Sequence, residues 1–342
     1  MGDETELERL IASGRFPSVA QSRATSAQRL ESAREALRSH RGGGLDVVAF
    51  GSLARGEMTA ESDFDYLVLA RELPRDPRAT IDLLKRADAI RRDWGTGAGH
   101  DVRQPGASGL FGTAVGAFEM IDQIGLQADT NHSLTRRMLL LEESTSLMDS
   151  EVHAEVVSAA LERYLHVGPK PASDPDKAPR FLLNDVVRYW RTLSVDYQAK
   201  ARDGEQVSGL RYLKLVISRK VVFAGTLMSL VTCGLDGWHK ATADDLRAQF
   251  AMTPLERLVQ GYSRFDDKGR EAIEGVIAVV DYFLKASGNA EWRDAVRRGR
   301  SDGAAVEEFE QARRQAQDLQ SHLESLFFFG ELQGRTRALL VF

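Results

Sequence analysis

Two short apolar runs, 47–50 and 63–69, constrain the fold more than any other part of the chain. The first ends at Gly51, and the second is rich in aromatic and branched residues. Runs of this kind that are bounded by turn residues are typical of strands. Asp63 and Asp65 open the second run. Because side chains alternate along a strand, both carboxylates are expected on one face, with their Cα atoms roughly 6–7 Å apart.

This arrangement suits phosphoryl chemistry. Two carboxylates at this separation can share a pair of divalent ions, and two such ions about 4 Å apart stabilise the attacking and leaving oxygens of a displacement. Gly51 lets the backbone approach a phosphate closely, and Ser52 adds a hydroxyl donor. The alternative is an Asp-rich turn before an ordinary strand. The Gly-Ser pair upstream, with a strand on each side, favours a catalytic site at Asp63 and Asp65.

The Gly-Ser and Asp-x-Asp residues resemble the signature of the DNA polymerase β nucleotidyltransferase superfamily. Arg55-Gly56 and the run 61–63 make the segment similar to the nucleotidyltransferase domain of bacterial nitrogen-signalling uridylyltransferases and their short relatives. The resemblance covers residues 47–104. It implies an α/β (α+β) domain with a small mixed sheet that transfers a nucleoside monophosphate from an NTP with release of pyrophosphate. It also implies two Mg²⁺ ions, with Mn²⁺ as a substitute, held by Asp63 and Asp65, and phosphates held by Gly51, Ser52 and Arg55.

A third metal ligand is expected on a neighbouring strand, as the resemblance implies. Residues 99–104 read as a candidate third strand, and Asp101 is the best placed acid on it. Some of the uridylyltransferases carry no acid at this position. The alternative is therefore a strand-end Asp101 that pairs with Arg103.

Two further features leave alternatives open. The glycine-rich stretch 105–116 is either a loop that closes over the substrate or a turn-rich crossover. A helix capped by Thr130 or Asn131 and running to about Glu143 is expected to be largely buried. Arg136 and Arg137 near its start either reach nucleotide phosphates or pair with acids such as Glu142 and Asp129, and pairing with an acid is favoured for one of the two.

A proline-rich segment divides the chain. Residues 168–179 hold four of the nine prolines and fit neither a helix nor a central strand. We therefore predict a catalytic domain with N-terminal helices over 1–167, a linker over 168–180, and an α-helical bundle domain over 181–342 that closes the nucleotide cleft.

Cations gather on two predicted helices of the second domain, 181–201 and 209–231. Related nucleotidyltransferases use a helical domain to supply Lys or Arg to the triphosphate, and Arg forms bidentate phosphate contacts while Lys acts as a point charge. The alternative is a solvated helix face. The candidate nucleotide-binding residues are Arg188, Arg191, Lys214 and Lys220.

Composition narrows the class of protein. A net charge of −5 argues against a general nucleic-acid binder, so a protein or a small molecule is favoured as acceptor over a nucleic acid such as an RNA end, and a second nucleotide stays a candidate. The single cysteine fits a reducing compartment, and the acidic start of the chain lacks the apolar core of a signal peptide. The apolar run 221–235 is too short to cross a bilayer. We expect a cytoplasmic enzyme without membrane contact.

The remaining alternatives concern partners and activity. The apolar C-terminal residues 339–342 pack either within the chain, which we favour, or in a homodimer. A catalytically silent nucleotide-binding sensor or interaction module is a different reading of the same motif. The nucleotidyltransferase component of a toxin–antitoxin or phage-defence system is a third. The presence of both Asp63 and Asp65 favours an enzyme.

Overall fold

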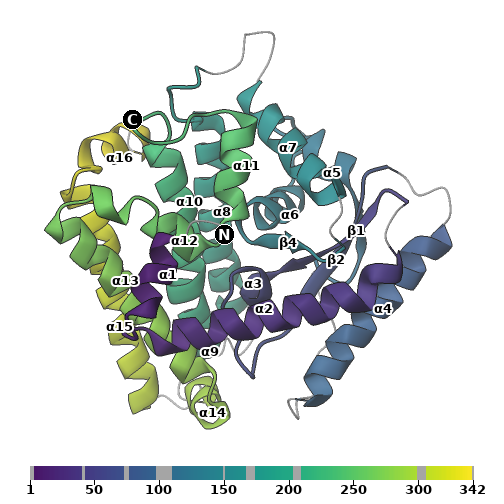
Figure 1. The fold of residues 1–342 in the computed structure, drawn as a ribbon, viewed down its shortest axis with the longest axis horizontal. Helices are drawn as coiled ribbons and strands as arrows, with labels where there is room; N and C mark the ends of the chain where they lie inside the picture. Colours follow the sequence, from purple (N-terminus) through teal and green to yellow (C-terminus); the bar gives the residue numbers. More distant parts are fainter. Residues whose placement is uncertain are drawn as a thin grey trace.

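The computed structural model describes eight stretches of the chain and shows a small sheet beside a large group of helices (Figure 1). The described residues are 4–40, 43–72, 77–97, 110–148, 151–166, 174–202, 209–298 and 306–340. The predicted third strand at 99–104 and Asp101 therefore lie outside the described residues.

The sheet is small and mixed, as the sequence predicted. Its strands are β1 (Leu45–Phe50), β2 (Asp65–Ala70), β3 (Ala114–Gly116) and β4 (Ser144–Ser146), in the order β3-β2-β1-β4. β1 pairs antiparallel with β2 and β4, and β2 pairs parallel with β3. Because β2 begins at Asp65, Asp63 lies in the loop that leads into the strand. The glycine-rich stretch ends in strand β3, which neither alternative for that stretch had foreseen.

The two faces of the sheet pack against different elements. On one face, Val47, Ala49 and Val68 pack with the end of α2 (Pro17–Leu37) and with α4 (Pro77–Gly97). On the other face, alternate residues such as Val48 and Leu67 join a core made largely of helices. This alternation follows from the two-residue period of a strand. The sheet is therefore covered on both sides.

Seven helices precede residue 167 within the described part. They are α1 (Glu6–Ala12), α2, α3 (Gly51–Ala54), α4, α5 (Ala117–Ile121), α6 (Asn131–Glu142) and α7 (Glu151–Leu165). The predicted N-terminal helices are present as α1 and α2, which are separated at residues 13–16. Thr130 caps α6 by accepting a hydrogen bond from the Ser133 backbone N at 3.2 Å, as predicted.

The regular secondary structure in the described residues of the second half of the chain is all helical, as predicted. Its helices are α8 (Arg180–Arg202), α9 (Gly209–Lys214), α10 (Lys220–Thr232), α11 (Ala243–Ala251), α12 (Pro254–Val259), α13 (Asp267–Ser287), α14 (Ala290–Arg298), α15 (Glu307–Glu324) and α16 (Gln333–Leu340). Two π-helical turns, Leu215–Arg219 and Ser325–Phe329, join α9 to α10 and follow α15. The sequence had not indicated these turns, nor α11, α14 and α16.

The helical run Gly209–Thr232 is long and apolar enough to cross a membrane by length and composition alone. However, 67% of its most apolar window is buried inside the protein, where α10 packs against α8 and α12. Its burial by neighbouring helices marks it as a core helix. The predicted helix over 209–231 ends within one residue of this run.

The two halves of the chain share a hydrophobic core. One cluster contains Phe50 and Leu69 of the sheet, Leu213 of α9 and Ile273 of α13. Helix α2 crosses the molecule from α13 to the sheet and α4 (Figure 1). Residues 168–173 of the predicted linker lie outside the described residues. The division into two domains stays a prediction.

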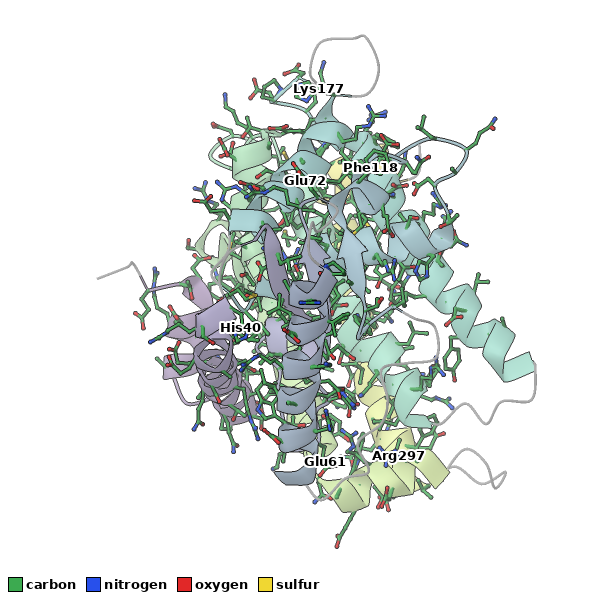
Figure 2. The ribbon with its side chains drawn as sticks, turned by 90° about the vertical axis from the view of Figure 1, so that its right-hand side faces the viewer. His40, Glu61, Glu72, Phe118, Lys177 and Arg297 are labelled. Atoms are coloured by element: carbon green, nitrogen blue, oxygen red, sulfur yellow. The ribbon has the colours of Figure 1, made fainter. Side chains whose placement is uncertain are left out.

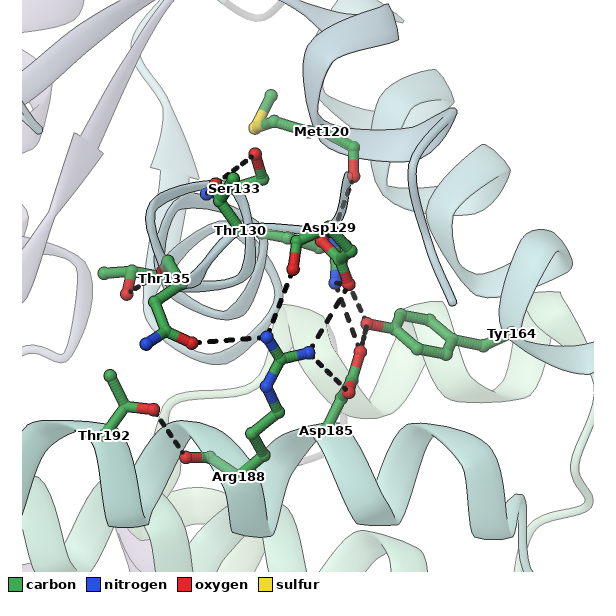
Figure 3. A network of polar contacts seen from close by, with 11 residues as sticks. Met120, Asp129, Thr130, Ser133, Thr135, Tyr164, Asp185, Arg188 and Thr192 are labelled. Atoms are coloured by element: carbon green, nitrogen blue, oxygen red, sulfur yellow. Dashed lines mark hydrogen bonds and ion pairs between the residues drawn. The ribbon is translucent and has the colours of Figure 1, made fainter. Parts of the chain in front are cut away.

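A buried polar network also joins the two halves (Figure 3). Arg137 of α6, wholly buried, donates to Asp129 at 2.8 Å, to Asp185 of α8 at 3.1 Å and to the Tyr164 hydroxyl at 2.6 Å. Nη1 of Arg136 lies 3.7 Å from Oε2 of Glu119. Of the two alternatives left open by the sequence, the structure shows pairing with acids for both arginines.

The C-terminal apolar residues differ in exposure. Phe327 is buried, whereas Phe329 is 71% exposed. Leu339 and Leu340 are partly buried against the main core, which is the contact within the chain that we favoured. The last two residues lie outside the described part.

Candidate functional site

A polar cavity of about 100 Å³ lies where the Gly51 turn and the start of β2 meet the helical half of the chain. The first half contributes Gly51, Ser52, Arg55, Glu57, Thr59, Ser62, Asp63 and Asp65. The second half contributes Lys214, Ser218, Arg219, Phe283, Leu284, Ser287 and Arg293. Seven of these fifteen side chains carry a formal charge, four positive and three negative, which suits a charged ligand better than an apolar one.

The Gly-Ser turn lies directly beside the second carboxylate. Phe50 ends β1 opposite Asp65 in the strand register. Gly51 then adopts a positive φ of +66° and starts the four-residue helix α3. A Cβ atom at Gly51 would lie 3.3 Å from Oδ2 of Asp65. Glycine at this position therefore permits both the left-handed backbone and the close approach to the carboxylate.

Asp63 and Asp65 both line the cavity, the first exposed and the second partly buried. Within the described part of the chain, neither carboxylate has a hydrogen bond or an ion pair. Burial raises the pKa of Asp65, the Arg219 charge opposes this, and the Asp63 charge adds to it. Two carboxylates that repel each other at the wall of a solvent-connected cavity present oxygen ligands of the kind that Mg²⁺ takes from proteins.

Asp101, the predicted third carboxylate, lies outside the described residues. The described chain resumes at residue 110 and runs beside the start of β2, where the Gly112 backbone N donates to the Tyr66 carbonyl at 2.7 Å. Phe111 also contacts Phe50, with ring centroids 5.6 Å apart. Among described residues, no group of three Asp, Glu, His or Cys side chains could hold a metal ion.

The π-helical turn brings cations to the cavity from the helical half. Lys214 and Arg219 are five residues apart, which in an α-helix places them about 140° apart around the axis. In a π-helical turn, hydrogen bonds join residues five apart, so such residues lie nearly above one another. The turn at Leu215–Arg219 therefore lets Lys214, Ser218 and Arg219 all line the same cavity.

Both cations are electrostatically perturbed. Desolvation lowers the pKa of Lys214, and repulsion from Arg293 adds to this, while Asp63 and Asp65 act in the opposite direction. The Lys214 side chain still keeps contact with solvent. Burial lowers the pKa of Arg219 to about 10, with repulsion from Arg55 as the second cause. Carboxylates near both groups oppose this lowering of the pKa, Asp63 and Asp65 at Lys214 and Asp65, Glu57 and Glu142 at Arg219.

Arg55 and Arg219 converge on one buried carboxylate behind the cavity. Arg55 donates from Nε to Oε2 of Glu57 at 2.7 Å and also pairs with Glu143. Arg219 pairs with the other oxygen of Glu143. The Glu143 side chain has no exposed surface. Three sequence-distant elements thus meet in one charged cluster.

Three of the predicted nucleotide-binding residues do not line this cavity. Arg188 donates to the Asp129 carbonyl and to Oδ1 of Asn131, each at 3.2 Å (Figure 3). Lys220 donates to Oε1 of Gln320 at 2.8 Å, and Arg191 lies on an exposed part of α8. For Lys220 the reason is helical geometry, because it follows Arg219 and points to a different side.

Arg293 is a cavity residue that the sequence did not single out. It lies on α14 and is 6% exposed, with its Nε 3.8 Å from Oε2 of Glu61. Glu61 and Arg297 lie at the end of the molecule opposite Lys177 (Figure 2). Glu143 and Phe283 were missed as well. No local pattern marks these residues, because the places of Arg293 and Phe283 in the cavity wall and of Glu143 behind it depend on contacts between distant segments.

Comparison with known proteins agrees with the motif. Residues 30–101 match the family model described as nucleotidyltransferase domain. A search of curated proteins found no match. The match supports transfer of a nucleoside monophosphate as the general activity, and the described strands β1 and β2 with the Gly51 turn lie inside the matched segment. The chain thus carries a nucleotidyltransferase domain over residues 30–101, consistent with the polymerase β-like superfamily that its Gly-Ser and Asp-x-Asp residues resemble.

Proposed function

We propose that the protein transfers a nucleoside monophosphate from an NTP to an acceptor and releases pyrophosphate, and that the polar cavity is the active site. One observation carries this proposal. Two carboxylates without hydrogen bonds or ion pairs from described residues line one cavity together with a glycine turn, which lies against Asp65, and four cations. This is the composition that a metal-bound triphosphate requires.

The residues divide into two groups by charge. Asp63 and Asp65 would hold Mg²⁺, or Mn²⁺ in its place, with Asp101 as the candidate third ligand. Two carboxylates fit this ion because Mg²⁺ is commonly bound by one or two carboxylates together with substrate phosphates. The bound ions would lower the pKa of the acceptor oxygen and neutralise charge at the transferred phosphorus.

The cations and the glycine turn would receive the phosphates. Gly51 and Ser52 present backbone and hydroxyl donors, while Arg55, Lys214, Arg219 and Arg293 supply positive charge. Charge-assisted hydrogen bonds to phosphate are roughly twice as strong as neutral ones. Arg188, Arg191 and Lys220 are left out of this set because they do not line the cavity.

The size of the cavity limits what it can enclose. A volume of about 100 Å³ is well below the 300–1,000 Å³ of typical ligand pockets. The cavity therefore fits the phosphate groups, and the nucleoside and the acceptor would extend beyond it. With a net charge of −5, we favour a protein or small-molecule hydroxyl as acceptor over a nucleic acid, in the cytoplasm.

The test is NTP binding by calorimetry with each of the four nucleotides, with and without Mg²⁺, on the wild type and on Asp63→Asn/Asp65→Asn. We expect metal-dependent binding that the double variant loses. Equal binding by the two proteins would contradict the proposed site. Pyrophosphate release in the presence of candidate acceptors then separates an enzyme from a catalytically silent sensor, which would bind without turnover.

A further inference from the structure

Glu143 occupies an unusual position between the two halves of the chain. It follows α6 directly, and its side chain is wholly buried. One carboxylate oxygen pairs with Arg55, which follows the Gly51 turn, and the other pairs with Arg219 of the π-helical turn. A single buried acid therefore holds two cavity cations that are far apart in the sequence.

The Glu143 backbone is anchored independently of any ligand. Its N–H donates to the Leu139 carbonyl at 3.1 Å. The next residue, Ser144, begins β4 and pairs with Phe50 in the strand register. Phe50 in turn precedes Gly51, so strand pairing sets Glu143 beside the glycine turn. The acid is thus part of the rigid sheet edge, which favours a fixed positioning role.

The two arginines have other carboxylates within electrostatic reach. Both Arg219 and Arg55 act on Asp65, yet no ion pair joins either of them to Asp65 in the described structure. A guanidinium paired with a carboxylate occupies the oxygen lone pairs that a metal ion would need. Something must therefore keep the guanidinium groups away from the aspartates.

We propose that Glu143 is a positioning residue that holds Arg55 and Arg219 away from Asp63 and Asp65. The aspartates then stay open to a divalent cation, and the remaining donors of the arginines stay directed at the phosphates. This inference rests on the proposed function of the cavity. Without Glu143, Arg219 would lose its ion pair and Arg55 would keep only Glu57, so both cations would be drawn to the aspartates and compete with the metal.

The test is Mn²⁺ binding in the absence of nucleotide, measured by electron paramagnetic resonance on the full chain. We expect Glu143→Gln to weaken Mn²⁺ affinity at least tenfold, because it frees Arg219 and leaves Arg55 held by Glu57 alone. Glu143→Gln/Arg219→Gln should recover much of the affinity, since the freed cation is then absent. A merely structural role would predict no such recovery.

The matched control is Asp185→Asn, which alters another buried acid that pairs with an arginine, outside the cavity. It should leave Mn²⁺ affinity unchanged. If Glu143→Gln binds Mn²⁺ as the wild type does, or if the double variant shows no recovery, the inference is wrong. If the wild type itself binds neither Mn²⁺ nor metal–NTP, the proposed function fails instead.

A variant that keeps Glu143 provides a second test in case Glu143→Gln does not fold. Arg219→Gln alone should bind Mn²⁺ at least as tightly as the wild type, because it removes a cation near Asp65. It should bind NTP more weakly, because it also removes a phosphate donor. Loss of Mn²⁺ affinity in Arg219→Gln would contradict the proposed competition.

Discussion

Gly51 and Asp65 face each other at the ends of adjacent strands, so closely that a Cβ on Gly51 would lie 3.3 Å from Oδ2 of Asp65. Gly51→Ala should therefore have two effects. Because the backbone at this position is left-handed, the substitution should cost about 1–2 kcal/mol of stability. The new methyl group should also displace the Asp65 carboxylate. We expect weaker Mn²⁺ binding, measured by titration, together with a lower melting temperature.

Gly14 offers a matched control for this substitution. It also has a positive φ, of +75°, but a Cβ there would meet no atom within 4 Å. Gly14→Ala should lose a similar amount of stability and keep the Mn²⁺ affinity of the wild type. Equal Mn²⁺ affinities for the two variants would show that the contact with Asp65 does not matter.

Removal of either carboxylate should abolish turnover without harming the fold. Asp63→Asn or Asp65→Asn should reduce the rate of pyrophosphate release at least about 100-fold, the scale seen when one group that stabilises a transition state is removed. The metal-free variant should melt at or above the wild-type temperature, because burial and Asp63 both raise the pKa of Asp65. Near-wild-type rates would show that the metal assignment is wrong.

Lys214 should contribute to NTP affinity. A hydrogen bond to a charged group contributes about 1.5–3 kcal/mol, so Lys214→Met should weaken NTP binding by roughly 10- to 100-fold. Lys220→Met is the control, because Lys220 donates to Gln320 outside the cavity. Calorimetry measures NTP affinity for both variants. Equal losses of affinity would mean that Lys214 contributes no more to NTP binding than a lysine outside the cavity.

The buried network around Arg137 should stabilise the fold. Arg137→Met leaves the carboxylates of Asp129 and Asp185 without their main cation, and breaking a buried pair in this way costs about 3–5 kcal/mol. Urea denaturation should show this loss. The exposed pair Arg38–Glu35 provides the control, since Arg38→Met should change stability by about 0–1 kcal/mol.

Asp46 should make the stability depend on pH. Burial raises its pKa to about 7 from 3.8, although Ser146 donates to it at 2.8 Å. Between about pH 4 and 7 the folded state therefore binds more protons at this group than the unfolded state, so its contribution falls as pH rises, by at most about 1.4 kcal/mol per pH unit.

Asp46→Asn removes the titrating group and keeps a carbonyl oxygen for Ser146. The difference in unfolding free energy between Asp46→Asn and the wild type should grow in favour of the variant as pH rises from 4 to 7. Urea titrations at four pH values across this window measure it. A constant difference would mean that Asp46 does not titrate there.

Much of the secondary structure could be predicted because its signals are local. The apolar run that ends at Gly51, the cap at Thr130 and the periodic apolar residues of α15 each depend on neighbours in the sequence. The short strands β3 and β4 have three residues each, too few for a period to show, and the structure alone reveals them. The predicted roles of Asp63, Asp65, Gly51 and Ser52 stay predictions, although all four line one cavity.

The amino-acid sequence by itself determined the nucleotidyltransferase segment and the helical character of the second half, since motif spacing and periodicity are properties of adjacent residues. The tertiary structure decided which cations meet the carboxylates. Lys214 and Arg219 reach the cavity together with Arg293, while Arg188 pairs elsewhere. Glu143 and Arg55 are 88 residues apart in the sequence. Their contact depends on how β4, the glycine turn and a π-helical turn pack against one another, and no local pattern encodes that packing.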